Sequence, residues 1–146
     1  MNIYGIIKAL RNNVENGFID SLKELIHGEV FSDFLEMADS LLNAGYKDAA
    51  TVIGGGVLES HLRQLCIKAK LDIEDITEDY VRPKKAERLN SDLARAGEYP
   101  VLDQKNVTAW LDLRNKAAHA KYDEYKKEQV GFFLAGIRDF LNRHPA

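Results

Sequence analysis

The chain has 146 residues, 45% of them hydrophobic, which is enough to bury one core and form one domain. Its formal net charge of −3 gives no overall basic character, so strong non-specific nucleic-acid binding is not predicted from charge. A single cysteine, Cys66, excludes an intrachain disulfide and fits a reducing cytosol, and no apolar run has the length of a signal peptide or membrane span. We therefore expect a cytoplasmic protein.

Helical periodicity dominates the chain and alternating strand patterns are absent, so we predict an all-α fold. The first helix is expected from about Ile3 to Val14 and is broken by Asn16-Gly17. A second, short helix capped by Asp20 or Ser21 is expected to end at His27-Gly28, which would place His27 where the helix dipole favours a cation. The next helix is predicted over Phe31 to Ala44 and closed by Gly45.

A long helix is predicted from about Lys47 to Lys70, although it contains three consecutive glycines that each cost about 1 kcal/mol relative to alanine. Gly54 shares a helical stripe with Leu58 and Leu62, so close approach of another helix would explain it. Gly55 is expected nearer the edge of that stripe, and Gly54→Leu should therefore disturb packing more than Gly55→Leu. A phosphate-binding loop is rejected because the run lacks the Gly-Lys-Ser/Thr ending and a preceding strand.

The same helix contains four polar or sulfur-containing side chains whose presence can be explained by their place in the helix, without a catalytic role. Glu59 and Arg63 are four residues apart and can pair across one turn. His61 borders the apolar stripe as a histidine at the edge of the core, and Cys66 falls within the apolar pattern as a core residue rather than a nucleophile. These positions are interpreted as structural.

The segment from Leu71 to Tyr80 is acidic and is interpreted as a solvated connection, because it lacks the glycine and the spacing of a calcium loop. No His-Cys cluster suggests zinc, so neither a metal nor a cofactor is expected. Pro83 is predicted to start a helix over Lys84 to Ala96. Four of the residues from 82 to 88 are basic against one acid, which fits a solvated helix start or weak RNA-backbone contacts by Lys84, Lys85 and Arg88.

Asp103 is expected to open the helix that contains residues 114–119, and a final amphipathic helix is predicted from about Glu124 to Arg143. Phe132 points away from the apolar face of that last helix and is a candidate for contact with another subunit. The expected architecture is one domain of five to six helices, with a four-helix up-and-down core over residues 31–146 and an N-terminal extension over residues 1–30.

The segment from Arg114 to His119 places polar groups in an otherwise apolar helix face. With about 100° per residue, a stripe forms in which Arg114 lies centrally while Asn115 and His119 lie along one edge; the apolar members of the stripe are Val107, Trp110, Leu111, Ala117 and Ala118. Arginine keeps its charge and needs a partner or an anion, and histidine titrates near neutral pH. These types can bind a phosphate and move protons near it.

A purely structural interpretation of the motif stays open. A histidine in the last turn of a helix interacts favourably with the carbonyl dipoles there. Arg114 can stack on Trp110 or pair with a carboxylate such as Asp112 or Glu59.

The pattern Arg114, Asn115 and His119 resembles the Arg-polar-x-x-x-His signature of the HEPN superfamily (higher eukaryotes and prokaryotes nucleotide-binding domains). A second run, Leu58 to Arg63, resembles the Leu-Glu-x-x-Leu-Arg run of the family's second core helix, and the similarity covers about residue 31 to the C-terminus. The resemblance implies a helical bundle and a metal-independent endoribonuclease, often a toxin or antiviral effector. Other members are non-catalytic modules that bind a nucleotide or a protein.

On this resemblance, Arg114, Asn115 and His119 would be catalytic, with Lys116 as a further weak RNA contact. His119 would transfer protons while the ribose 2′-hydroxyl attacks the phosphate, and a hydrogen bond from Asn115 would orient its ring. A shared site in a homodimer is expected, because five residues of straight helix point two side chains roughly 140° apart. The alternative is a monomer in which the motif helix frays at Ala118 and lets His119 turn back toward Arg114. An antitoxin is a further possible partner. A plain helical oligomerisation domain stays open as a third class of function.

Overall fold

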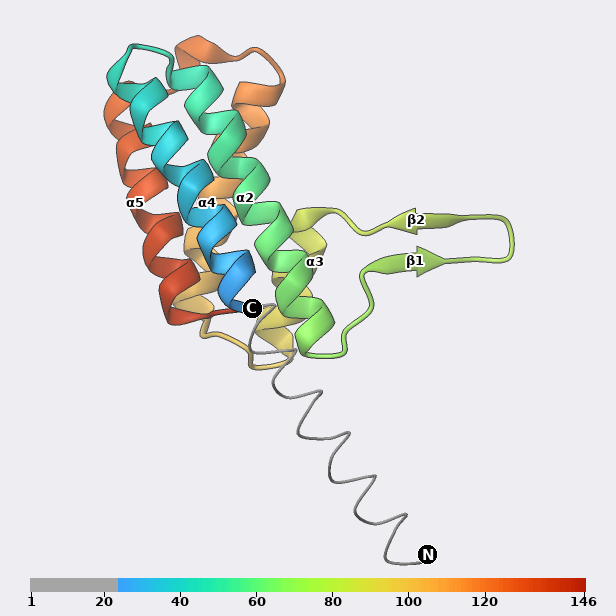
Figure 1. Ribbon diagram of the computed structural model, residues 1–146. Helices are drawn as coiled ribbons and strands as arrows, with labels where there is room; N and C mark the ends of the chain where they lie inside the picture. Colours follow the sequence, from blue (N-terminus) through green and yellow to red (C-terminus); the bar gives the residue numbers. More distant parts are fainter. Residues whose placement is uncertain (1–23) are drawn as a thin grey trace, which may run out of the picture.

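In a computed structural model of the protein, which describes residues 24–146, helices run side by side along most of the molecule and a small hairpin projects from it (Figure 1). The all-α fold is therefore confirmed. The elements are a helix over residues 24–43, α2 (Lys47–Lys68), β1 (Glu74–Ile76), β2 (Val81–Pro83), α3 (Ala86–Arg95), α4 (Val101–Ala118), a 3₁₀ turn η1 (Tyr122–Glu124) and α5 (Lys127–Arg143). The predictions for residues 3–14, 16–17 and 20–21 lie outside the described residues. No helix within residues 24–146 is long and apolar enough to cross a membrane.

The helix over residues 24–43 runs through Gly28 without a break, so the predicted end at His27-Gly28 is wrong. A glycine inside a helix costs only about 1 kcal/mol, and tertiary packing on both sides of it outweighs that cost. His27 stacks on His61 of α2 and Phe31 is buried in the core. The end at Gly45 is confirmed: its φ of +96° is the left-handed conformation that favours glycine.

The core lies around α2, which packs against α3, α4 and α5. Every helix contributes to its largest fully buried side chains, which are Leu35, Leu58, His61, Leu62, Leu89, Leu93, Leu111, Tyr125, Phe133, Leu134, Ile137 and Phe140. Cys66 is fully buried, as predicted, and burial raises the pKa of its thiol to about 11. The thiol is therefore an inert core group.

Two of the three glycines in α2 allow neighbouring elements to approach closely. A Cβ on Gly54 would lie 2.7 Å from the side chains of Leu134 and Phe133 in α5. A Cβ on Gly55 would overlap Cγ of Arg114 in α4 and would lie 2.9 Å from its Cβ. Gly55 is also buried, so, contrary to the prediction, a position toward the edge of the stripe does not make its packing looser. The stem of Arg114 occupies the space that a side chain at residue 55 would need.

The acidic connection folds into a hairpin, which the sequence analysis did not predict. β1 and β2 pair antiparallel with Asp75 opposite Arg82, and Pro83 lies in β2 instead of starting a helix. The guanidinium of Arg82 lies 4.1 Å from the ring centre of Tyr80. This cation–π contact stabilises the end of the hairpin that is nearest the turn. Three-residue strands are too short to leave an alternating pattern in the sequence.

The ends of α4 and α5 differ from the predicted ones. α4 begins at Val101, directly after Pro100, and Asp103 is buried because it pairs with Arg143 at 2.8 Å. α5 begins at Lys127 instead of Glu124, because the preceding residues form η1. In the predicted stripe of α4, Val107, Leu111 and Ala117 are buried, whereas Ala118 is exposed because the helix ends there.

The packing at the two glycines reverses the predicted order of their substitutions. We expect Gly55→Ala to lower the free energy of unfolding by about 1–3 kcal/mol, because the new methyl group meets the part of Arg114 that is fixed to the α4 backbone. Gly54→Ala should cost less, since it meets the outer ends of two side chains. Urea unfolding of both variants measures this, and a larger loss for Gly54→Ala would contradict it.

Candidate functional site

Arg114 extends from α4 toward α2 and α3, and its side chain is 21% exposed. Its Nη1 donates a hydrogen bond of 2.6 Å to Oε2 of Glu59 in α2, and its Nη2 lies 3.7 Å from Oε1 of Glu87 in α3. The predicted alternative that Arg114 pairs with Glu59 is thus confirmed. Its Nε is buried and has no hydrogen-bond partner among residues 24–146. The guanidinium therefore keeps a donor that the surrounding carboxylates do not use.

Glu59 belongs to a short network of charges. Its Oε1 accepts a hydrogen bond of 3.1 Å from Arg63, as predicted from their spacing. Arg63 also donates to the main-chain oxygen of Lys84, at 2.8 Å, and so ties α2 to the segment before α3. One carboxylate thus serves two arginines, and Arg114 is held in place by a charge-assisted hydrogen bond to it.

Asn115 also turns toward α3. Its Nδ2 donates a hydrogen bond of 3.0 Å to Oε1 of Glu87, instead of the predicted bond to His119. Partial burial acts to raise the pKa of Glu87, but the hydrogen bonds it accepts and the charges of Arg114 and Lys85 outweigh burial, and the pKa is lowered. Glu87 is therefore a carboxylate at neutral pH.

His119 lies just past the last residue of α4 and is exposed. Its backbone N–H still donates to the oxygen of Asn115, at 3.0 Å, while Ala120 adopts a left-handed φ of +57°. Within the described part of the chain, the His119 ring has no hydrogen-bond partner. The ring is thus open to solvent at the mouth of the site.

The three predicted catalytic residues line one open hollow of about 540 Å³, together with residues from α2 and the start of α3. The full lining is Glu59, Lys85, Ala86, Glu87, Arg114, Asn115 and His119. Lys85 is the one member of the predicted RNA-contact set that lies here. Because α4 ends at Ala118, a single chain brings Arg114 and His119 to the same hollow, which a straight helix would not do.

The other predicted RNA contacts are engaged elsewhere. Lys84 pairs with Asp92 at 3.1 Å in a largely buried ion pair, and Arg88 binds both carboxylate oxygens of Asp75, at 2.7 and 2.8 Å. Lys116 pairs with Asp112 at 3.2 Å on another face of α4. Their carboxylate partners reduce the positive charge that each offers to a phosphate.

Glu87 is the residue of the hollow that sequence reasoning missed. It reaches Arg114 and Asn115 from a different helix, 27 and 28 positions earlier in the chain, and no local spacing predicts that contact. With Glu59 and Glu87 opposite Arg114 and Lys85, the formal charges of the lining balance when His119 is neutral. An anion entering the hollow must therefore compete with carboxylates for the arginine.

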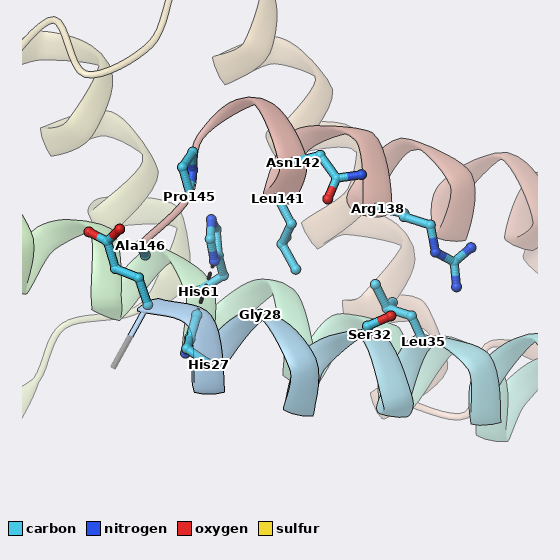
Figure 2. A pocket seen from close by; sticks show the side chains of 11 residues that line it. His27, Gly28, Ser32, Leu35, His61, Arg138, Leu141, Asn142, Pro145 and Ala146 are labelled. Atoms are coloured by element: carbon cyan, nitrogen blue, oxygen red, sulfur yellow. Dashed lines mark hydrogen bonds between the residues drawn. The ribbon is translucent and has the colours of Figure 1, made fainter. Parts of the chain in front are cut away.

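A second hollow, of about 250 Å³, lies between the 24–43 helix, α2 and the end of the chain (Figure 2). His61 reaches it from α2 and is fully buried, deeper than the core edge that was predicted. Its Nε2 lies 2.7 Å from the main-chain oxygen of His144, which can only accept, so this nitrogen carries the proton. The Nδ1 of His61 therefore accepts from Nε2 of His27, at 3.2 Å.

This arrangement keeps His61 neutral. Burial lowers the pKa of His61 to about 4. The nearby charges of His27, His144 and Lys68 also act to lower this pKa, whereas the hydrogen bond to the main-chain oxygen of His144 acts to raise it. The predicted role of His27 as a helix-end cation is wrong: the helix continues past it, and burial lowers its pKa as well. We interpret the pair as a structural clamp on the C-terminal residues.

Residues 24–146 contain no group of three or more His, Cys, Asp or Glu side chains placed to hold a metal ion. No family model, curated protein or solved structure matches the chain.

Because His61 is buried, the protein should become less stable as the pH is lowered. The pKa of His61 is lower in the folded state than the 6.5 of an exposed histidine, so between about pH 6.5 and 4 the unfolded chain takes up a proton that the folded chain does not. We expect the free energy of unfolding to drop by up to about 3 kcal/mol across this range. Urea unfolding at pH 7 and pH 5 measures the drop. His61→Gln should flatten it, and an unchanged slope in that variant would contradict the assignment.

Proposed function

We propose that the protein is a metal-independent endoribonuclease that cleaves RNA by attack of the ribose 2′-hydroxyl on the adjacent phosphate. The proposal rests above all on one observation: Arg114, Asn115 and His119 line a single hollow that is open to solvent. The resemblance of these residues to the HEPN motif supports the same reaction. Cytoplasmic action as a toxin or antiviral effector, with or without an antitoxin, belongs to this proposal.

Arg114 would hold the phosphate. Its guanidinium is fixed by Glu59 and is 21% exposed beside the hollow, so a phosphoryl oxygen that bridges or displaces that carboxylate gains a charge-assisted hydrogen bond. Lys85 lies on the same hollow and adds a second positive charge. As negative charge builds on the phosphoryl oxygens in the transition state, both cations stabilise it.

His119 would transfer the protons. The 2′-hydroxyl must lose a proton and the departing 5′-oxygen must gain one, and an imidazole can serve either step for about 10²–10⁴-fold in rate. The exposed ring stands at the mouth of the hollow, where an RNA strand can reach it. The products would carry a 2′,3′-cyclic phosphate and a 5′-hydroxyl, and the reaction would proceed in EDTA.

One observation favours a second candidate, a non-catalytic module that binds a nucleotide or a protein. Glu59 and Glu87 already face Arg114, and Asn115 is committed to Glu87 instead of orienting His119. Such a site can recognise a partner without performing chemistry. A shift of the melting temperature on adding nucleotides, without cleavage of RNA, would select this candidate.

We expect His119→Ala and Arg114→Ala each to reduce the rate of RNA cleavage by about 10²-fold or more, because one removes the proton-transfer group and the other the main phosphate contact. The assay incubates purified protein with total RNA in EDTA and follows the 2′,3′-cyclic phosphate ends.

His27→Ala is the matched control, since it removes a histidine from outside the hollow and should leave the rate within about twofold of wild type. Circular dichroism and urea unfolding must first show that each variant folds, because Arg114 also bridges α4 to α2. A folded His119→Ala or Arg114→Ala protein that cleaves at the wild-type rate would exclude that residue from the mechanism.

The proposal includes a homodimer formed through α4 and α5. Phe132 is 77% exposed and borders a hollow of about 350 Å³ with Trp110, Leu113 and Phe133. Asp112 and Lys116 give the rim both signs of charge, which suits a surface that meets its own copy across a twofold axis.

We expect Phe132→Ser to shift the dimer toward monomer, because it removes an exposed aromatic anchor from the surface. Light scattering over a dilution series measures the mass, and cleavage is followed over the same concentrations. A monomeric mass at concentrations where wild-type cleavage is undiminished would reject the dimer as the active species.

A further inference from the structure

An apolar groove separates the 24–43 helix from α2, which lie side by side (Figure 1). Its volume is about 260 Å³, and its lining is Phe31, Phe34, Val52, Ile53, Gly56, Val57 and Ser60. Phe34 is 44% exposed and Val52 is 53% exposed, although both are large apolar side chains. Ile26, Val30 and Met37 extend the exposed stripe along the 24–43 helix at the spacing of one helix face.

Gly56 is the glycine of α2 that the described packing leaves unexplained. Gly54 and Gly55 admit neighbouring side chains, whereas a Cβ on Gly56 would meet no atom of residues 24–146 within 4 Å. A glycine inside a helix costs about 1 kcal/mol relative to alanine, and close approach of another segment can offset that cost. Gly56 lies on the groove between Val52 and Ser60, one turn from each, so this row of α2 leaves room for a further helix.

The outer edge of the groove is acidic. Glu29, Asp33 and Glu36 are exposed beside the apolar stripe, and the sequence of the 24–43 helix contains no lysine or arginine. A segment that covers the stripe must therefore offer an apolar face flanked by positive charge. That requirement describes a basic amphipathic helix.

We propose that residues 3–14 of the same chain bind in this groove as a helix. At about 100° per residue, Ile3, Ile7, Leu10 and Val14 share one face, which Ile6 extends. Lys8 and Arg11 both fall on one side of that face, and the segment contains no acidic residue. Its apolar face matches the groove, and its two cations match the three carboxylates.

The lengths also agree. A helix of residues 3–14 would be about 18 Å long, and the exposed stripe from Ile26 to Met37 extends about 17 Å along its helix. Between Val14 and Glu24, the chain can reach up to about 33 Å, which is enough to reverse direction and return along the groove. Asn16-Gly17 supplies residues suited to such a turn. The inference is independent of the RNA-cleavage proposal.

A photocrosslink in the full-length protein tests this occupant. Benzoyl-phenylalanine replaces Phe34, and the sample is an equal mixture of ¹⁴N- and ¹⁵N-labelled chains that is irradiated, digested and analysed by mass spectrometry. We expect crosslinks to residues 3–14 in which both peptides carry the same label. The matched control is the same probe at Phe132, an exposed aromatic residue on α5, which should not crosslink to residues 3–14.

Two variants then test the fit. Leu10→Asp and Gly56→Leu should each lower the crosslink yield at least about fivefold, one by placing charge on the apolar face and the other by filling the space above Gly56. Gly56→Leu should also lower the urea midpoint. Gly28→Leu is its control, since a Cβ there likewise meets nothing within 4 Å and removing the glycine should raise the midpoint.

Three results would overturn the proposal. The first is that the probe at residue 34 forms no crosslink, or crosslinks only to residues other than 3–14. The second is that the crosslinked peptides carry different labels, which would identify a second copy as the occupant. The third is a urea midpoint that rises in Gly56→Leu as it does in Gly28→Leu.

Discussion

The approach of α4 and α5 to α2 at two adjacent glycines is the constraint on which the rest of the molecule depends. Gly54 accepts side chains from α5, and Gly55 accepts the aliphatic stem of Arg114 from α4. A side chain at either position would push the outer helices apart, because protein interiors are packed too densely to absorb it. The bundle is thus organised around one helix whose backbone is directly accessible on two sides.

The same contact determines the electrostatics of the candidate site. With its stem against Gly55, Arg114 is held close to Glu59, four residues further along α2, and the two form a hydrogen bond of 2.6 Å. Glu87 approaches from α3 and fixes Asn115. The hollow therefore has an immobile cation balanced by carboxylates, which favours a ligand that can displace or bridge them over one that only seeks positive charge.

Sequence patterns predicted the parts of this protein that depend on neighbours along the chain. The helical fold, the end at Gly45, the Glu59–Arg63 pair and the burial of Cys66 all follow from periodicity or short spacing. The failures depend on tertiary contacts: the helix runs through Gly28 because packing outweighs a local preference, and Glu87 joins the site from another helix. A straight helix was expected to point Arg114 and His119 apart, whereas the end of α4 at Ala118 lets both line one hollow with Asn115, whose partner Glu87 was not predicted.

The residues of the motif lie on two different kinds of backbone, because α4 ends between Asn115 and His119. Arg114 and Asn115 belong to a helix packed in the bundle, whereas His119 sits on a turn closed by Ala120 in a left-handed conformation and by the bond from Lys121 N–H to the oxygen of Lys116. Left-handed geometry is unfavourable for alanine, so this turn is held by its hydrogen bonds and not by residue preference. The direction in which the His119 side chain points is therefore determined by the turn. Substitutions at residues 120 and 121 can change that direction while Arg114 stays in place.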